Sequence, residues 1–155
     1  MKKKYQPRPK VNPIALINAT TQPFASLTSH VQKIRNQHWT AFEKVRSGKL
    51  DVHSLVILVN TMNMVIALLA LYKVGQDKLF EIGDFCQVVR LAFNQALNGQ
   101  PVSFSSDDLV AIESGLNVHH SHFQSISVFH IRKAREFIAR HSKPSQPLEL
   151  VLQPT

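Results

Sequence analysis

Three histidines, His119, His120 and His122, lie within four residues, and His130 follows about two helical turns later. Histidine is the commonest transition-metal ligand, and residues three apart share a helix face, which makes His119 and His122 weak metal candidates. Zinc sites usually add cysteine or carboxylate ligands at recognisable spacings, and no cysteine or His-Glu-x-x-His motif is near. His119 also falls on an apolar helical stripe. We therefore interpret these residues as structural or surface histidines, and we predict no metal and no other cofactor.

Motifs for enzymatic chemistry are absent from the sequence. It holds no Gly-x-Ser-x-Gly motif, no glycine-rich phosphate loop and no nucleotide fingerprint. The only cysteine, Cys86, has apolar neighbours at helical spacing in Ile82 and Val89, which favours a buried thiol over a reactive one. The acidic pair Asp107-Asp108 is better explained by helix capping than by acid–base work. The sequence therefore predicts a protein that is not an enzyme.

The distribution of charge is the strongest functional signal. Residues 1–42 contain seven basic residues and no acidic one, so most of the formal net charge of +8 lies there. A block of one sign attracts an anionic partner from a distance. Lysine and arginine pair with phosphates, and an aromatic residue can stack on a base. The candidate contacts to nucleic acid or to an acidic protein surface of the host are Lys2, Lys3, Lys4, Tyr5, Arg8, Lys10, Lys33, Arg35, Lys44, Arg46, Lys49, Arg132, Lys133, Arg135 and Arg140.

A solubilising tail is the simplest alternative for the first 22 residues. The positive charge continues through the following helix to Lys49, however, and residues 132–155 carry five basic and two acidic residues. A tail alone does not need either feature. If the last helix lies beside the first, the two basic segments form one face. We expect that face to bind without sequence specificity, because segment 52–74 is too apolar to act as a recognition helix in the major groove.

Apolar residues recur at three- and four-residue steps along most of the chain, which predicts an all-α fold. The expected architecture is one bundle of four to five mostly antiparallel helices at residues 23–141. A basic, extended, proline-containing arm at 1–22 precedes it, and a proline-containing extended tail at 142–155 follows it. The expected helices are 26–47, 52–74, 78–97 and 105–141, with a break near 125–127 favoured over one continuous last helix.

Local signals place the ends of these helices. Glycine in the left-handed region often stops a helix, and Ser or Asp often caps its start. The expected stops are Gly48, Gly75 and Asn98-Gly99. The expected N-caps are Asp51, Asp77, Ser127, and Ser105 with Asp108 in capping-box spacing.

The segment Leu55–Lys73 is apolar and approaches the length of a membrane span. Asn60, Thr61 and Asn63 lie inside it, and each polar group would need a partner in lipid. We therefore expect a buried central helix and no membrane contact. The single cysteine and the lack of a visible signal peptide favour the cytoplasm of a bacterial cell. A homodimer, or a helix contact within the chain, could use the small-residue edge that carries Asn60, Asn63, Ala67 and Ala70.

The opening Lys3-Lys4-Tyr5-Gln6-Pro7-Arg8-Pro9, followed by Asn12-Pro13-Ile14-Ala15, resembles a family of short uncharacterised proteins of proteobacterial phages and prophages. Those proteins open with a Lys-Tyr-x-Pro-Arg/Lys arm and continue as all-helical domains. The segment Leu58-Val59-Asn60-Thr61-Met62-Asn63 is similar to an Asn-x-x-Asn-type segment of that family. The resemblance covers about a third of the chain. It implies a phage or mobile-element context and no particular activity.

The leading hypothesis is a non-enzymatic phage-type protein that contacts nucleic acid through the arm, the first helix and the last helix. The alternative is a phage-encoded inhibitor of a host protein or defence complex, which would be anti-CRISPR-like and directed at protein. A second alternative is a structural or self-assembling phage protein. The charge asymmetry favours the first hypothesis without excluding the others.

Overall fold

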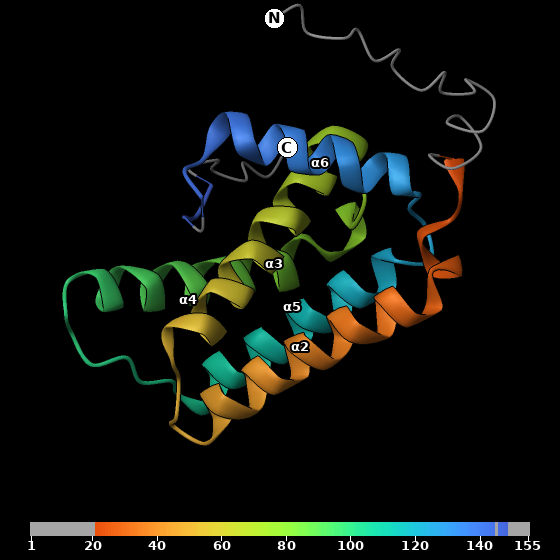
Figure 1. Cartoon of the computed structure of the whole chain (residues 1–155). Helices are drawn as coiled ribbons and strands as arrows, with labels where there is room; N and C mark the ends of the chain where they lie inside the picture. Colours follow the sequence, from red (N-terminus) through yellow and green to blue (C-terminus); the bar gives the residue numbers. More distant parts are fainter. Residues whose placement is uncertain (1–20, 145, 149–155) are drawn as a thin grey trace, which may run out of the picture.

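Helix α3 (Val52–Tyr72) lies at the centre of the computed structural model, which describes residues 21–144 and 146–148 (Figure 1). Apolar side chains on nearly every side of α3 allow it to pack against several helices at once. It contacts four others: α2 (Thr28–Arg46), α4 (Leu79–Leu97), α5 (Ser106–His122) and α6 (Val128–His141). The described residues contain these five α-helices and no strand, which confirms the predicted all-α bundle.

Helix α3 passes between the other helices (Figure 1). On one side of α3, helices α2 and α5 run next to each other in opposite directions. Helix α6 lies across the other side of α3. Helices α2 and α6, which carry the basic residues, therefore both pack on α3.

The segment before α2 is attached to the connection between α5 and α6. Its one-turn 3₁₀ helix η1 (Phe24–Ser26) starts where the backbone N–H of Phe24 donates to the carbonyl of Ile126 at 2.9 Å. The N–H of Val128 donates to the carbonyl of Gln22 at 3.1 Å. The predicted arm, residues 1–22, otherwise lies outside the described residues.

Several predicted helix ends are confirmed. The Asp51 side chain accepts the N–H of Ser54 at 2.8 Å at the start of α3. Ser105 and Asp108 form the expected capping box before α5. The predicted break between the last two helices is also confirmed, because α5 ends at His122 and the N–H of Ser127 donates to His130 Nδ1 at the start of α6. Gly48 and Gly99 have the positive φ angles, 67° and 65°, that end α2 and α4.

Two predicted ends were wrong. Helix α3 stops at Tyr72 because Lys73 already takes the left-handed conformation, with φ of 59°, so Gly75 is not the stop. Asp77 does not cap α4. Gly75 has a φ of 84° and leads into a second 3₁₀ helix, η2 (Gln76–Lys78), which contains Asp77. Helix α4 follows at Leu79 without a side-chain cap, since η2 already turns the chain.

Close contact between α4 and α5 depends on Gly115. A Cβ atom at this position would lie 2.2 Å from Cγ of Phe85, a fully buried residue of α4. The first core cluster fills the space between α3, α4 and α5, and includes Met62, Ile66 and Leu116. A second cluster joins the later part of α3 to η1 and α6. The two clusters bury opposite sides of α3.

Two of the four residues on the predicted small-residue edge of α3, Asn63 and Ala67, are buried within the chain, whereas Asn60 and Ala70 are exposed. Asn63 is buried and binds an extended part of the tail, because its Nδ2 donates to the carbonyl of Gln146 at 2.6 Å and its Oδ1 accepts the N–H of Leu148 at 2.8 Å. Leu148 is fully buried and packs in the first cluster. Ala67 packs in the second cluster with Ala134 of α6. The homodimer stays a prediction.

Helix α3 is long and apolar enough to cross a membrane by length and composition. In the structure, however, 67% of its most apolar window is buried within the bundle. Core helices of soluble proteins share these properties, so one such helix is weak evidence for a membrane span. The structure is compatible with the buried central helix that the polar residues of the segment predicted.

Candidate functional site

Three adjoining hollows cross α3 from α2 to α6, and we call them together the trough. The α2–α3 groove has a volume of about 550 Å³ and contains Lys33 and Lys44. The middle hollow has about 230 Å³ and lies where η1, α2, α3, α5 and α6 meet. The α3–α6 groove has about 480 Å³ and contains Arg135 and Lys143.

Shared lining residues show that the three hollows adjoin one another. Gln37 and Ile57 line both the α2–α3 groove and the middle hollow. Asn60, Met64 and Arg135 line both the middle hollow and the α3–α6 groove. The trough therefore reaches from α2 to α6 over one exposed side of α3. It brings the two basic helices to opposite walls of one surface, although they do not form the single packed pair that the sequence analysis considered.

The charge of the trough has one sign. Its lining contains Lys33 and Lys44 on α2, Arg135 on α6 and Lys143 just after α6. None of the described residues that line the three hollows is a carboxylate. Among residues 21–144 and 146–148, Lys33, Arg135 and Lys143 take part in no ion pair. These three cations are thus available to an anionic ligand, and no described acid in the lining competes with it.

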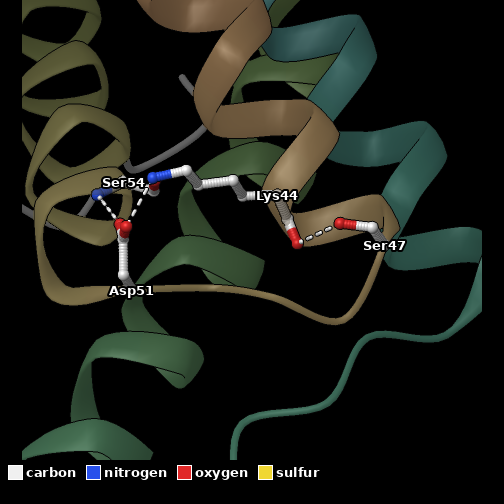
Figure 2. A network of polar contacts seen from close by, with 4 residues as sticks. All are labelled: Lys44, Ser47, Asp51 and Ser54. Atoms are coloured by element: carbon white, nitrogen blue, oxygen red, sulfur yellow. Dashed lines mark hydrogen bonds and ion pairs between the residues drawn. The ribbon is translucent and has the colours of Figure 1, made fainter.

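Lys44 is the exception, since it already holds a carboxylate. Its Nζ contacts Oδ2 of Asp51 at 2.5 Å, at the end of the loop between α2 and α3 (Figure 2). The bond from Lys44, followed by the bonds from Ser54, holds the pKa of Asp51 well below its usual range. The pair fixes the closed end of the α2–α3 groove, so Lys44 contributes less free charge than Lys33.

The other predicted basic residues lie outside the trough lining. Arg46 pairs with Glu43 at 2.7 Å, and Lys133 pairs with Glu136 at 2.7 Å. Arg132 approaches Glu136 at 3.9 Å and lies over the ring of Phe129. Three further candidates, which line none of the three hollows, are Arg35, Lys49 and Arg140. The arm candidates fall outside the described residues: Lys2, Lys3, Lys4, Tyr5, Arg8 and Lys10.

A chain of buried polar side chains lies beneath the middle hollow. His38 Nδ1 is 2.9 Å from His120 Nε2, and His38 Nε2 is 3.1 Å from Thr61 Oγ1. Thr61 Oγ1 also donates to the carbonyl of Ile57 at 2.8 Å. The single hydroxyl proton is used there, so Thr61 must accept from His38 Nε2–H. The network then assigns His38 Nδ1 as an acceptor, which receives the proton of His120 Nε2–H.

This assignment requires neutral imidazoles. Burial, reinforced by the charge of His120, lowers the pKa of His38 to about 4. Burial, followed by the Arg35 guanidinium, also lowers the pKa of His120 to about 4. A proton on His38 Nδ1 would face the Nε2–H of His120 and break the chain. The chain joins α2 to α3 and α5 and is held in one protonation state at neutral pH.

The two weak metal candidates are both buried in α5. Neither His119 Nδ1 nor either ring nitrogen of His122 has a partner among the described residues. Their ring centroids are 6.4 Å apart, and burial lowers the pKa of both residues. No group of three or more His, Cys, Asp or Glu side chains within the described residues is arranged to hold a metal ion. His119 instead packs edge-on against Phe123, at 4.9 Å between ring centroids.

Cys86 is buried in the core, as predicted from its neighbours. Burial raises the pKa of its thiol to about 12, an effect that the nearby Arg90 guanidinium only partly offsets. Thiolate, not thiol, is the nucleophilic form of cysteine. The environment of Cys86 therefore keeps it unreactive at neutral pH.

Sequence reasoning missed three parts of the trough. Asn60 was assigned to a packing edge, yet it is exposed and lines two of the hollows. Gln37 and Lys143 were not proposed at all. Gln37 follows Lys33 by one turn on the solvent side of α2, and this periodicity could have indicated a polar wall. Lys143 carried no signal, because its position depends on how α6 crosses α3.

Comparison of the chain with protein-family models, with curated proteins and with solved structures gave no match. The fold and the site together place the protein in the class of all-α bundles, with a basic trough across the central helix.

Proposed function

We propose that this chain is a non-enzymatic binding protein of bacteriophage type that contacts nucleic acid without sequence specificity in the cytoplasm of a bacterial host. The observation that carries the proposal is the trough, which presents Lys33, Arg135 and Lys143 and has no carboxylate among the described residues of its lining. Phosphate backbones are the polyanions that such a surface fits. The resemblance of the N-terminal arm to phage proteins supports the context.

The position of the cations supports non-specific binding. They stand on the walls of an open surface, and they belong to α2 and to the end of α6. Contacts to phosphate fix the position of a protein on nucleic acid but carry no sequence information. The arm, with its five Lys and Arg residues, would add further phosphate contacts.

Fluorescence anisotropy with labelled DNA and RNA oligonucleotides tests this proposal. If the three available cations of the trough contact phosphates, the affinity for a single strand should fall about 20-fold between ~50 and ~200 mM salt, from a slope of about −0.7 per contact. Contacts from the arm would steepen this dependence. Absence of binding at low salt, or binding that does not respond to salt, would contradict the proposal.

Matched variants locate the binding surface. R135A should weaken binding to all sequences alike and make the salt slope less steep by about 0.7, because one phosphate contact is lost. R140A removes an exposed arginine of the same helix that does not line the trough, and it is the control. K33A and K49A form a second pair of the same kind on α2 and the loop after it. Equal effects within both pairs would show that total charge, not the trough, governs binding.

An inhibitor directed at a host protein is the second candidate, and one observation favours it. Phe80 and Leu91 on α4 are 89% and 57% exposed. They are eleven residues apart, about 16 Å along one face of the helix. Aromatic residues, including Phe, are enriched at protein interfaces, so an exposed Phe80 favours contact with a protein. A stoichiometric partner that F80A/L91A loses, and that survives nuclease treatment of a host lysate, would favour this candidate.

A further inference from the structure

The rim of the middle hollow carries three exposed polar groups from three helices: Gln37 of α2, Asn60 of α3 and Arg135 of α6. None of them has a hydrogen bond or ion pair to another described residue. A carboxamide places a donor and an acceptor side by side. The rim therefore offers both kinds of hydrogen-bonding group, together with one cation, to whatever enters the hollow.

The floor between these groups is mainly apolar. It contains half-buried Ile34, Ile57 and Met64, backed by the buried ring of Phe123. Three buried polar side chains also line the hollow, namely His38, Thr61 and His119. The hollow, at about 230 Å³, is smaller than the sites that enclose drug-sized ligands, which start near 300 Å³. The combination of an apolar floor and a polar rim fits a single planar group with apolar faces and hydrogen-bonding edges.

The grooves on either side restrict the choice further. The middle hollow opens into the α2–α3 groove, which holds Lys33, and into the α3–α6 groove, which holds Arg135 and Lys143. Its occupant therefore has positive charge on both sides. An aliphatic side chain of a protein would leave the carboxamides of Gln37 and Asn60 without partners. A base in a polyanionic strand satisfies the floor, the rim and the flanking charges together.

We propose that the middle hollow accepts one unstacked base of a single-stranded nucleic acid, with phosphates of the same strand against the two flanking grooves. This inference rests on the proposed function and adds the form of nucleic acid and the place of the base. The base lies on Ile57 and Met64, and Asn60 and Gln37 bond to its edges. The floor has no exposed aromatic ring, so the gain from the base falls at the low end of the range for stacked bases, about fivefold in affinity.

Two oligonucleotides of equal length separate this inference from the proposed function. One carries thymine at every position, and the other has the same sugar–phosphate backbone with no bases. Phosphate contacts, including those of the N-terminal arm, are common to both and cancel in the ratio of affinities. The full-length protein should bind the thymine strand about fivefold more tightly than the abasic strand. A duplex should not show this fivefold gain in affinity, because its bases are paired and cannot enter the hollow.

Variants at the rim complete the test. N60A removes an exposed side chain and should bring the affinity for the thymine strand down to that for the abasic strand, leaving the abasic strand unaffected. Q37A should act in the same direction from the opposite wall. N117A, an exposed asparagine of α5 that does not line the trough, should change neither affinity. Circular dichroism confirms that each variant keeps its helical content.

Each outcome decides one question. Equal binding of thymine and abasic strands by the unaltered protein, with salt dependence retained, would overturn the base site and leave the proposed function standing. If N60A lost the same factor of affinity for both strands, the base site would also be overturned, because Asn60 would then contact the sugar–phosphate backbone. No binding of either strand at ~50 mM salt would overturn the proposed function itself.

Discussion

Acidification should destabilise this protein through the buried chain of His38, His120 and Thr61. The folded protein holds the pKa of His38 and of His120 at about 4, whereas histidine in an unfolded chain titrates near 6.5. Between these two values the unfolded state binds protons that the folded state does not. The stability that neutral imidazoles provide is therefore complete above pH 6.5 and is lost as the pH falls from 6.5 towards 4.

The magnitude follows from the two pKa values. The free energy of unfolding should be lower at pH 5 than at pH 7.5 by about 2 kcal/mol for each of the two histidines. Together they remove about 4 kcal/mol, a large part of the 5–15 kcal/mol that is typical of a single domain. Burial also lowers the pKa of His119 and of His122, the latter against an opposing effect of Asp77, so both act in the same direction.

The assay is urea unfolding at pH 7.5, 6.5 and 5, followed by the fluorescence of Trp39. This single tryptophan has its ring 5.6 Å from that of His120, so it reports directly on the packing of α2 against α5. H120Q keeps an N–H that can donate to His38 Nδ1 but removes one titrating group. Its loss of stability between pH 7.5 and 5 should be about 2 kcal/mol smaller than that of the unaltered protein.

H53Q, which removes an exposed histidine from the first turn of α3, is the matched control. If the unaltered protein lost less than about 1 kcal/mol between pH 7.5 and 5, the neutral assignment of the chain would be wrong. The same conclusion would follow if H120Q lost as much stability between pH 7.5 and 5 as the unaltered protein.

Three substitutions test the packing of the bundle. G115A should lower the free energy of unfolding by about 1–3 kcal/mol, because its Cβ would lie 2.2 Å from Cγ of the buried Phe85. G83A, whose Cβ meets nothing within 4 Å, should instead raise it by up to about 1 kcal/mol through helix propensity. Urea unfolding of both variants checks the pair. N63A should lower the free energy of unfolding by about 2 kcal/mol. It should also speed hydrogen exchange of the Leu148 amide, because that amide loses its acceptor.

The helices of this chain could be predicted from the sequence because local physics dictates them. Apolar periodicity located all five, and Asp51, Ser105 and Ser127 marked three starts correctly. The end of α3 could not be predicted in this way. Lys73 takes the left-handed conformation that usually belongs to glycine, and the sequence signal pointed to Gly75 two residues later.

The trough could be predicted only in part. Charge patterning marked Lys33 and Arg135 as candidate binding residues, and the structure shows that both are exposed and line the trough. Their meeting on one surface depends on how α2 and α6 cross α3, which no local pattern encodes. The same holds for the buried chain, where His38 and His120 are 82 residues apart in sequence. A histidine on an apolar stripe signals burial, but it does not identify its partner.

The buried chain and the trough depend on the same packing of α2. His38 joins α2 to Thr61 of α3 and to His120 of α5, and Gln37 beside it forms one rim of the middle hollow. Loosening this packing at acid pH would move the α2 wall, with Lys33, away from Arg135 on the α6 wall. Acidification should thus weaken binding and stability together. K33A should weaken binding alone, because Lys33 is exposed and makes no ion pair with a described residue. The contrast between the two perturbations distinguishes a preformed trough from a flexible, charged surface.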